Sequence, residues 1–497
     1  MFELVNYASV LLFFLISVCL LYLRWRKPSD LPPGPSCFPP IGNIRTAANK
    51  TLVTAFREWR KEYGDIYTVG LGAKWVVVIN GYETFKEAFV DRGDVFSDRP
   101  DLFVNRFINE KRGIIGSDGE TWKQLKRFTL GALRNFGFGK SSLEKKIVEE
   151  VNVFLEYIYK TKEKNFYIDE KVNVSISNII CSIAFGERYD YEDEKFVKLI
   201  RMLDEYISNS KLTTMVNFIP LLRFVPGDFF SVKKVLSNQR DIETFIQDRI
   251  DEHKITFENR RNIGDFVDAA IHEMNTRKKD GTIKSDTNNH NVQTRKIIRD
   301  LFIAGTQTTA TTIKWFILFQ ILYPEVQEKM WREIDDHIGS HRFPSTADRQ
   351  SMPYCEAVIQ ETLRIGNITP LSVLHGTNSD IFFKGYRIPK GSVIVPNLDS
   401  VLMDETTFPE PERFYPERFI GKDGKLHGLE KNIAFSIGRR ACLGESLARM
   451  ELFLFCTSLV QRFKFLPPYG TEPPEVKRIL GLQYSPAPFM LRAVNRQ

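Results

Sequence analysis

The hydrophobic pattern of the chain is most continuous at its N-terminus. From Leu4 to Leu23 no residue is charged, and Leu, Phe, Val and Ile dominate. About twenty apolar residues are enough for a helix to cross the hydrocarbon core of a bilayer. Glu3 precedes the run and bulky residues end it, which does not fit a cleaved signal peptide. We therefore predict a single transmembrane signal-anchor over residues 1–23.

The residues that follow predict the orientation of this anchor. Arg24, Arg26 and Lys27 come directly after it, and by the positive-inside rule the rest of the chain is cytoplasmic. Leu31-Pro-Pro-Gly-Pro35 cannot form a helix, because proline lacks an N–H donor and fixes φ. Residues 24–40 are therefore predicted to be a basic, proline-rich hinge, and residues 41–497 a single catalytic domain.

Helical periodicity covers much of the remaining chain. One segment, Arg295 to Leu322, predicts a single long helix, and a polar, breaker-rich stretch before it, 277–291, predicts a loop. Residues 66–79 instead alternate β-branched and aromatic residues around Gly70-Leu-Gly72, which predicts a hairpin. The expected fold class is mainly α with small β-sheets (α+β). Further helices are expected over 144–159 and 232–253.

A second apolar segment, Phe218 to Gly227, is too short and too often broken by proline to cross a bilayer. It fits either a part of the core or a loop that dips into the membrane face. The sequence leaves both alternatives open.

Composition and charge narrow the function classes. The chain has 497 residues, of which 43% are hydrophobic and 26% charged, and a formal net charge of +7. This diffuse charge fits an anionic membrane surface or an acidic protein partner and does not indicate a nucleic acid. The six cysteines have no CxxC spacing, which argues against a zinc site or a redox dithiol. Only Cys442 lies in a loop rich in Gly and Arg.

The strongest chemical signal is the run Phe435-Ser-Ile-Gly438-Arg-Arg440-Ala-Cys442-Leu-Gly444. It matches all five positions of F-x-x-G-x-R-x-C-x-G and resembles the cytochrome P-450 family. The resemblance implies haem b between a cysteine-ligand loop and a long oxygen-activating helix, with the Cys442 thiolate on the iron. Backbone N–H groups of Leu443 and Gly444, at the start of a helix, are expected to stabilise the sulfur anion. The same resemblance implies that Gly438 permits a tight turn and that Gly444 lets the backbone approach the porphyrin closely. It also implies that Phe435 shields the sulfur and that Arg440 pairs with a haem propionate.

A second constellation is Glu361-Thr-Leu-Arg364, which places a carboxylate and a guanidinium on one helix face. Taken alone, it fits an ordinary surface pair of little energetic value. The later segment Pro416-Glu-Arg418-Phe favours a special role. The family resemblance implies that Glu361, Arg364 and Arg418 form a buried structural triad.

The long helix contains Ala304-Gly305-Thr306-Gln307-Thr308, which resembles the oxygen-activating motif of the family. The resemblance implies that Ala304 and Gly305 open a groove and that the Thr308 hydroxyl relays protons. The sequence departs from the family at the usual acid, where Gln307 cannot deliver a proton by ionising. We hypothesise that Gln307→Glu improves the coupling of NADPH use to product.

The resemblance also places the remaining cofactor and substrate contacts. Trp122 and Lys126 occupy the positions of a propionate-binding helix, with Lys126 in place of the usual arginine. Arg99 and His375 are expected to be further propionate partners. The residues expected to line a hydrophobic substrate pocket are Leu102, Phe107, Ile115, Ala304, Val373 and Leu482.

These residues together predict a haem-thiolate monooxygenase of the endoplasmic reticulum membrane. It would insert one atom of O2 into a steroid, a fatty acid or a foreign compound. Gly70-Leu-Gly72 lacks the rest of a dinucleotide-binding motif, so the electrons must come from a partner protein. The expected partner is an NADPH-dependent flavoprotein reductase, with cytochrome b5 as a second donor. One alternative is a haem-thiolate isomerase or lyase acting on oxygenated lipids. The other is a non-catalytic haem sensor.

Overall fold

The computed structural model describes residues 12, 27–37, 41–72, 74–135, 141–257, 263–279, 287–481 and 483–496. Nearly all of the predicted anchor, and the predicted pocket residue Leu482, lie outside the described residues. Among the residues that are described, no helix is both long and apolar enough to cross a membrane. The anchor thus stays a prediction.

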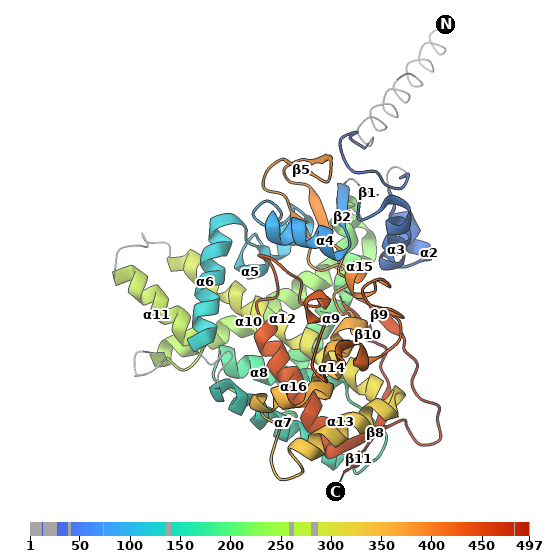
Figure 1. Ribbon diagram of the computed structural model, residues 1–497. Coiled ribbons are helices and arrows are strands. Elements are labelled where there is room, and N and C mark those ends of the chain that lie inside the picture. The colour runs from blue at the N-terminus through green and yellow to red at the C-terminus, as the bar shows by residue number, and fades with distance from the viewer. Residues whose placement is uncertain are drawn as a thin grey trace.

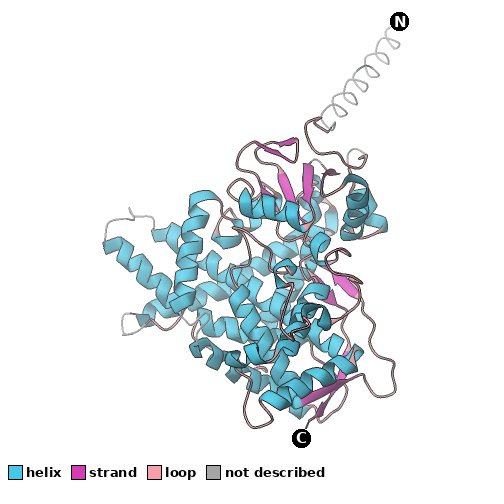
Figure 2. Ribbon diagram, in the orientation of Figure 1, coloured by secondary structure: helices cyan, strands magenta, loops and turns pink. Residues whose placement is uncertain are grey.

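Helices make up most of the described chain, with small sheets at its periphery, which confirms the predicted fold class (Figures 1 and 2). The helices are α2 Ile44–Asn49, α3 Leu52–Tyr63, α4 Tyr82–Lys86, α5 Gly113–Gly116, α6 Gly119–Asn135, α7 Ser141–Lys160, α8 Asp169–Ala184, α9 Glu194–Val216, α10 Val232–Phe257, α11 Phe266–Lys279, α12 Thr287–Leu322, α13 Pro324–His337, α14 Pro353–Gly366, α15 Asp399–Leu402 and α16 Glu445–Arg462. Short π-helical turns are η1 Glu87–Asp91 and η2 Val104–Ile108, and short 3-10 helices are η3 Pro220–Phe224, η4 Pro226–Asp228, η5 Thr346–Ser351, η6 Pro416–Phe419 and η7 Leu429–Lys431.

The predicted hairpin is confirmed as β1 Ile66–Leu71 and β2 Lys74–Ile79, which pair antiparallel with Val69 opposite Val76. It belongs to a four-stranded sheet in which β2 also pairs parallel with β7 Val393–Pro396, and β7 pairs antiparallel with β4 His375–Gly376. A three-stranded sheet is ordered β3-β11-β8, and two hairpins complete the set. Their strands are β3 Phe166–Tyr167, β5 Ile381–Phe383, β6 Tyr386–Ile388, β8 Phe463–Leu466, β9 Arg478–Leu480, β10 Tyr484–Pro486 and β11 Met490–Asn495.

The central element is α12, which packs against α8, α10, α14 and α16. Near its C-terminus the residues from Trp315 to Phe319 are all fully buried, so this part of the helix is buried on every side. Such burial is typical of a helix enclosed by others. The predicted helix over 295–322 is therefore confirmed, and it forms the axis of the main hydrophobic core.

The prediction of a loop over 277–291 is wrong at both of its ends, because α11 continues to Lys279 and α12 begins at Thr287; residues 280–286 lie outside the described residues. Polar end turns of a helix need no apolar stripe, so periodicity missed them. In the apolar segment from Phe218, Phe218 is buried in the core, whereas Leu221 and Phe224 are 76% and 68% exposed.

Candidate functional site

The Cys442 loop is closed by its own backbone. The N–H of Cys442 donates to the carbonyl of Phe435 at 2.9 Å. Between them Gly438 has φ +85°, and a Cβ there would lie 1.9 Å from the carbonyl oxygen of Phe89, so only glycine fits the turn. Helix α16 begins at Glu445, directly after Gly444. The loop thus presents the thiol at a helix N-terminus.

Among the free cysteines that the structure describes, Cys442 is the exposed one. Burial by surrounding protein nevertheless raises its pKa, while a hydrogen bond from the backbone N–H of Gly444 lowers it. A Cβ added at Gly444 would meet nothing within 4 Å. The sulfur is accessible within a protein environment and is supported by a backbone donor, which suits a metal-binding thiolate.

One face of α12 is open although its neighbours on the helix are buried. Ala304 is exposed and Thr308, one turn later, is half-buried. The Thr308 hydroxyl donates to the carbonyl of Ala304 at 2.7 Å. Gly305 lies against α8, since a Cβ there would lie 2.5 Å from the side chain of Ile180. The two helices approach closely because Gly305 has no side chain.

Gln307 points away from this open face. It is buried, and its Nε2 donates to the carboxylate of Asp204 in α9. The side-chain amide of Asn173 donates to both oxygens of the same carboxylate at 2.9 Å. Burial raises the pKa of Asp204, and the charge of Lys314 together with these amide donors lowers it. Gln307 is therefore bonded to a carboxylate of α9 and does not face the open side of α12.

The cationic residues predicted to bind a propionate lie together. The Arg440 guanidinium is 4.0 Å from the Trp122 ring centre, and the Lys126 ammonium is 5.1 Å from it. Lys126 donates to the carbonyl of Arg439 at 2.6 Å, whereas its neighbour Arg127 is exposed. Arg440 donates to the carbonyls of Ser97, Ile114 and Ser117.

Arg99 and His375 complete this cluster. Arg99 donates to the carbonyls of Ile115 and Leu374 at 2.9 and 2.8 Å. The Nδ1 of His375 lies 2.7 Å from the carbonyl of Phe96, which fixes its proton on that nitrogen. We name Arg99, Lys126 and Arg440, which lie around Trp122 and His375, the cation cluster.

The charges of the cation cluster are incompletely balanced. Burial lowers the pKa of Arg440 to about 9, with Arg99 contributing through its charge. Burial likewise lowers the pKa of Arg99 to about 10, and burial together with Arg440 lowers that of Lys126. Asp118, 3.4 Å from Arg440, and the charges of Asp98 and Asp300 offset this only in part, because the pKa values of both arginines stay lowered. A bound anionic group would restore the balance, so the residues present fit a cofactor that carries carboxylates.

The residues Glu361, Arg364 and Arg418 also meet in the structure. Arg364 binds both oxygens of Glu361 at 2.7 and 2.8 Å, and both side chains are fully buried. Arg418 in η6 reaches the same carboxylate at 3.0 Å. The pair is therefore not an ordinary surface pair. Removing one member would leave a buried charge without its partner.

The predicted pocket residues differ in their surroundings. Phe107 and Val373 are 47% and 50% exposed, and Ile115 is half-buried. Leu102, in contrast, is buried in the apolar cluster formed with β1 and β2. The side chain of Leu102 is thus enclosed by this cluster and packs in the core.

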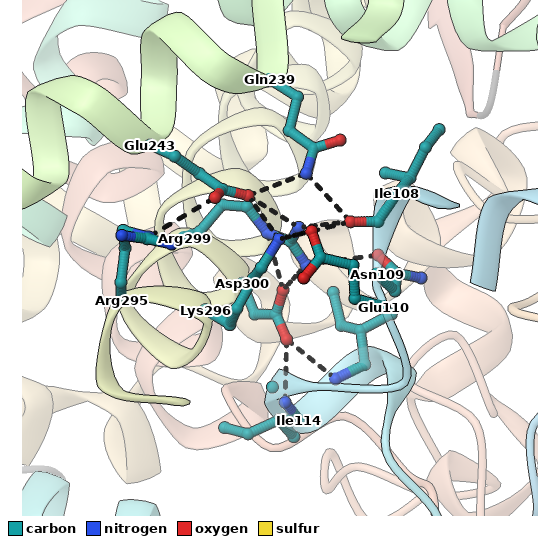
Figure 3. Close-up of polar contacts among 12 residues, drawn as sticks. Ile108, Asn109, Glu110, Ile114, Gln239, Glu243, Arg295, Lys296, Arg299 and Asp300 are labelled. Atoms are coloured by element: carbon teal, nitrogen blue, oxygen red, sulfur yellow. Dashed lines mark hydrogen bonds and ion pairs between the residues drawn. The ribbon is translucent and has the colours of Figure 1, made fainter. Parts of the chain in front are cut away.

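Sequence reasoning missed two sets of buried polar residues. One is Glu451 in α16, which accepts a hydrogen bond from Thr309 in α12. The other joins α10 and α12 to residues 104–116 through Glu243, Lys296, Arg299 and Asp300 (Figure 3). Both depend on contacts between helices, and no spacing along the chain indicates them.

Comparison with known proteins agrees with this geometry. A sequence model of the family described as "Cytochrome P450" matches residues 32–492. "Cytochrome P450 2J2" of Homo sapiens is 40% identical over 476 residues, which are 95% of this chain and 93% of that protein. "Cytochrome P450 2H1" of Gallus gallus is 39% identical over 497 residues (98% and 99%), and "Cytochrome P450 2D6" of Homo sapiens is 36% identical over 499 residues (99% and 99%).

The fold and the cysteine loop thus define a haem-thiolate oxidoreductase. The chain belongs to the cytochrome P-450 family, whose members are monooxygenases that use a haem-thiolate cofactor.

Proposed function

We propose that this chain inserts one atom of O2 into a hydrophobic small molecule, with electrons from an NADPH-dependent flavoprotein reductase. The observation that carries the proposal is the accessible thiol of Cys442 at the start of α16, in a family of monooxygenases. Steroids, fatty acids and foreign compounds all fit the apolar residues predicted to line the site.

Cys442 would hold the iron of haem b, and the cation cluster would hold its propionates. The haem, once bound, supplies the redox chemistry that activates O2, favoured by a thiolate ligand. Gly444 stabilises the thiolate through its backbone N–H. Arg99 and Arg440 fit the propionates because each is already oriented by hydrogen bonds to backbone carbonyls. Phe435, held against the Arg449 guanidinium at 4.9 Å, would shield the sulfur from water.

Thr308 would move protons on the substrate side. Its hydroxyl donates to the carbonyl of Ala304, so its lone pairs are free to accept a hydrogen bond on the open face of α12. Gln307 takes no direct part in this scheme, because Asp204 holds its amide. Protons would then reach Thr308 through water rather than through a side-chain acid on α12.

Electron donors would dock on the cysteine side. Arg439 is exposed beside Arg440 and offers a cation to an acidic partner, which could be the reductase or cytochrome b5. The basic net charge of +7 agrees with this polarity.

The proposed location is the endoplasmic reticulum membrane, with the catalytic domain in the cytosol. The charge-free run before Arg24 supports an anchor. Leu221, Phe224 and Phe229 support a second contact with lipid, because three large apolar side chains stand exposed between α9 and α10.

One observation favours a second function. A haem-thiolate isomerase or lyase acting on an oxygenated lipid needs no proton relay, and Gln307 has its amide engaged by Asp204. Thr308 on the open face argues for the monooxygenase.

Reconstitution with a flavoprotein reductase tests the proposal. We expect NADPH and O2 consumption with an oxygenated product, and loss of turnover in Cys442→Ala. Thr308→Ala should keep NADPH consumption and release peroxide instead of product. No consumption of NADPH together with conversion of a lipid hydroperoxide would support the isomerase. Neither activity in a haem-loaded chain would support the sensor.

A further inference from the structure

A cavity of about 490 Å³ lies between α3, α9 and the hairpin of β9 and β10. None of the described residues that line it belongs to α12 or to the Cys442 loop, so the cavity is separate from the candidate site. Its volume lies within the range of roughly 300–1,000 Å³ that is typical of sites for small organic molecules. The cavity is therefore large enough to hold a ligand of its own.

Three cations line this cavity, and carboxylates of the protein engage only one of them closely. Arg57 in α3 lies 2.6 Å from Asp399 and 3.1 Å from Glu412. Arg478 in β9 lies 3.7 Å from Glu412, which is longer than a hydrogen bond. Lys211 in α9 has no carboxylate within 4.0 Å among the residues that the structure describes. The positive charges of Arg478 and Lys211 are thus left for a ligand.

The Arg478 guanidinium is already oriented. Its Nη2 donates to the carbonyl of Ile365 at 2.8 Å, and its centre lies 5.7 Å from the ring centre of Trp315. A guanidinium binds a carboxylate through parallel hydrogen bonds, and a group that is held beforehand loses less freedom when the ligand arrives. Arg478 is therefore suited to receive an anionic group at the wall of the cavity.

The rest of the lining is largely apolar. Val53 of α3, Met403, Ile479 and Leu480 line the same cavity as the two cations. Methionine adapts its shape to different apolar ligands. A small inorganic anion would leave this apolar surface uncovered, and a neutral hydrocarbon would leave both cations without a partner. The lining as a whole fits a molecule that carries a carboxylate on an apolar chain.

The hairpin connects the cavity with α12. Leu480 and Tyr484 line the cavity and pair with each other across the two strands. In the turn between them, the side-chain amide of Gln483 donates to the Thr311 hydroxyl at 3.0 Å and to the carbonyl of Gln307 at 3.4 Å. A ligand in the cavity therefore contacts the same hairpin that is bonded to α12 next to Thr308.

We propose that this cavity is a second binding site, which takes an amphipathic carboxylate such as a single-chain fatty-acid anion. Lys211 and Arg478 bind the carboxylate, and the apolar chain lies along Val53, Met403 and Leu480. The bound molecule holds the β9–β10 hairpin in place. The site goes beyond the proposed function, because none of these residues takes part in the proposed oxygen chemistry.

Titration calorimetry on the haem-loaded protein tests the site, with a neutral azole on the haem to block the substrate side. Dodecanoate, kept below its micelle-forming concentration, should bind with one molecule per chain. Lys211→Gln should weaken dodecanoate binding about tenfold, the loss expected for one charge-assisted hydrogen bond. Dodecanol, which has the same chain without the charge, should bind the parent about tenfold more weakly than dodecanoate and should not respond to Lys211→Gln.

Lys198→Gln is the matched control. Lys198 is also an exposed lysine of α9, but it does not line the cavity. This variant loses the same charge and should keep the Kd of dodecanoate within about twofold of the parent, since exposed charges at a distance are largely screened. Equal weakening in the two lysine variants would show attraction to the overall charge and would overturn the proposal. Equal affinity of the parent for dodecanoate and dodecanol would overturn it as well.

Hydrogen exchange then locates the ligand. The backbone amides of Gly481 and Tyr484 donate to the carbonyls of Gln483 and Ile368 at 2.9 and 2.7 Å. Dodecanoate should slow their exchange in the parent, and slow it less in Lys211→Gln at the same concentration. Slower exchange elsewhere without any change in the hairpin would contradict the proposed site. A chain that takes up no haem would contradict the proposed function, and the same titration without the azole would still judge the cavity.

Discussion

The molecule contains two buried groups of cations that differ in how their charge is balanced. In the network of Glu243, Lys296, Arg299 and Asp300, which we name the α10–α12 network, Lys296 lies 2.8 Å from Glu243 and Arg299 lies 2.7 Å from Asp300, so each cation has a carboxylate. In the cation cluster, burial lowers the pKa values of Arg99 and Arg440, the charge of Arg99 further lowers that of Arg440, and Asp118 lies 3.4 Å from Arg440.

The difference separates a structural network from a binding site. A buried charge that is paired with an opposite charge of the protein needs no ligand to keep the folded chain stable. A buried charge without such a partner lowers the stability of the folded chain, and a bound ligand of opposite charge can offset that loss. The α10–α12 network is of the first kind and the cation cluster of the second. Each prediction below removes or shifts one charge to test that distinction.

The largest effect is expected from Arg299→Met. The substitution leaves Asp300 buried at 3% exposure without its cation, which should lower the free energy of unfolding by about 3–5 kcal/mol. Arg295→Met is the control, since Arg295 is 26% exposed and lies 3.5 Å from Glu243, and should cost at most about 1 kcal/mol. Denaturant unfolding of both variants measures this. Similar losses in the two variants would mean that the α10–α12 network is not a balanced unit.

Glu451 should make stability depend on pH. Burial raises its pKa to about 8, so in the folded protein it keeps a proton that the unfolded chain releases near its ordinary value of 4.5. Stability should therefore fall as pH rises between these values, by at most about 1.4 kcal/mol per pH unit from this group. Glu451→Gln, which can still bond Thr309, should flatten that slope. An unchanged slope in thermal unfolding from pH 5 to 8 would refute the assignment.

Gln307→Glu should be harmful by itself. The side chain of Gln307 lies against Asp204, so the new carboxylate would face that of Asp204. The free energy of unfolding should fall by about 1–2 kcal/mol at neutral pH. Asp204→Asn together with Gln307→Glu should recover the loss, because an amide and a carboxylate again face each other. Unfolding and product formed per NADPH should both be measured. Better coupling in the single variant Gln307→Glu would support the hypothesis from the sequence that an acid at position 307 is enough to improve coupling.

The smallest effect on folding is expected from Lys126→Gln. The Lys126 ammonium donates a hydrogen bond to the carbonyl of Arg439 and lies over the Trp122 ring, and burial lowers its pKa. Removing the charge should change the stability of the haem-free chain by less than about 0.5 kcal/mol and weaken haem retention. Lys126→Arg should keep retention near that of the parent. Loss of folding stability without loss of haem would place Lys126 among structural residues.

The sequence predicted those features that depend on local pattern. The hairpin of β1 and β2, the long helix α12 and the turn at Gly438 follow from alternation, periodicity and the demands of positive φ. Glu361 and Arg364 are three residues apart, so their shared helix face was foreseeable. The resemblance to a family then placed Arg418 beside them.

Long-range partners were not predictable. Asp204 lies on α9, far from Gln307 in sequence, and only the tertiary fold brings them together. Glu110 and Lys296 are likewise joined only by the tertiary fold. Gly305 matched a motif correctly, yet its contact with Ile180 gives it a packing role that no motif describes.

The most direct test of the central claim is the absorption spectrum of the reduced, carbon monoxide-bound protein. If Cys442 is the thiolate ligand, the parent chain should show the red-shifted haem band typical of thiolate ligation. Cys442→Ser should lose that band, whereas Arg295→Met should keep it. The same spectrum in the parent and in Cys442→Ser would contradict the assignment of Cys442 to the iron.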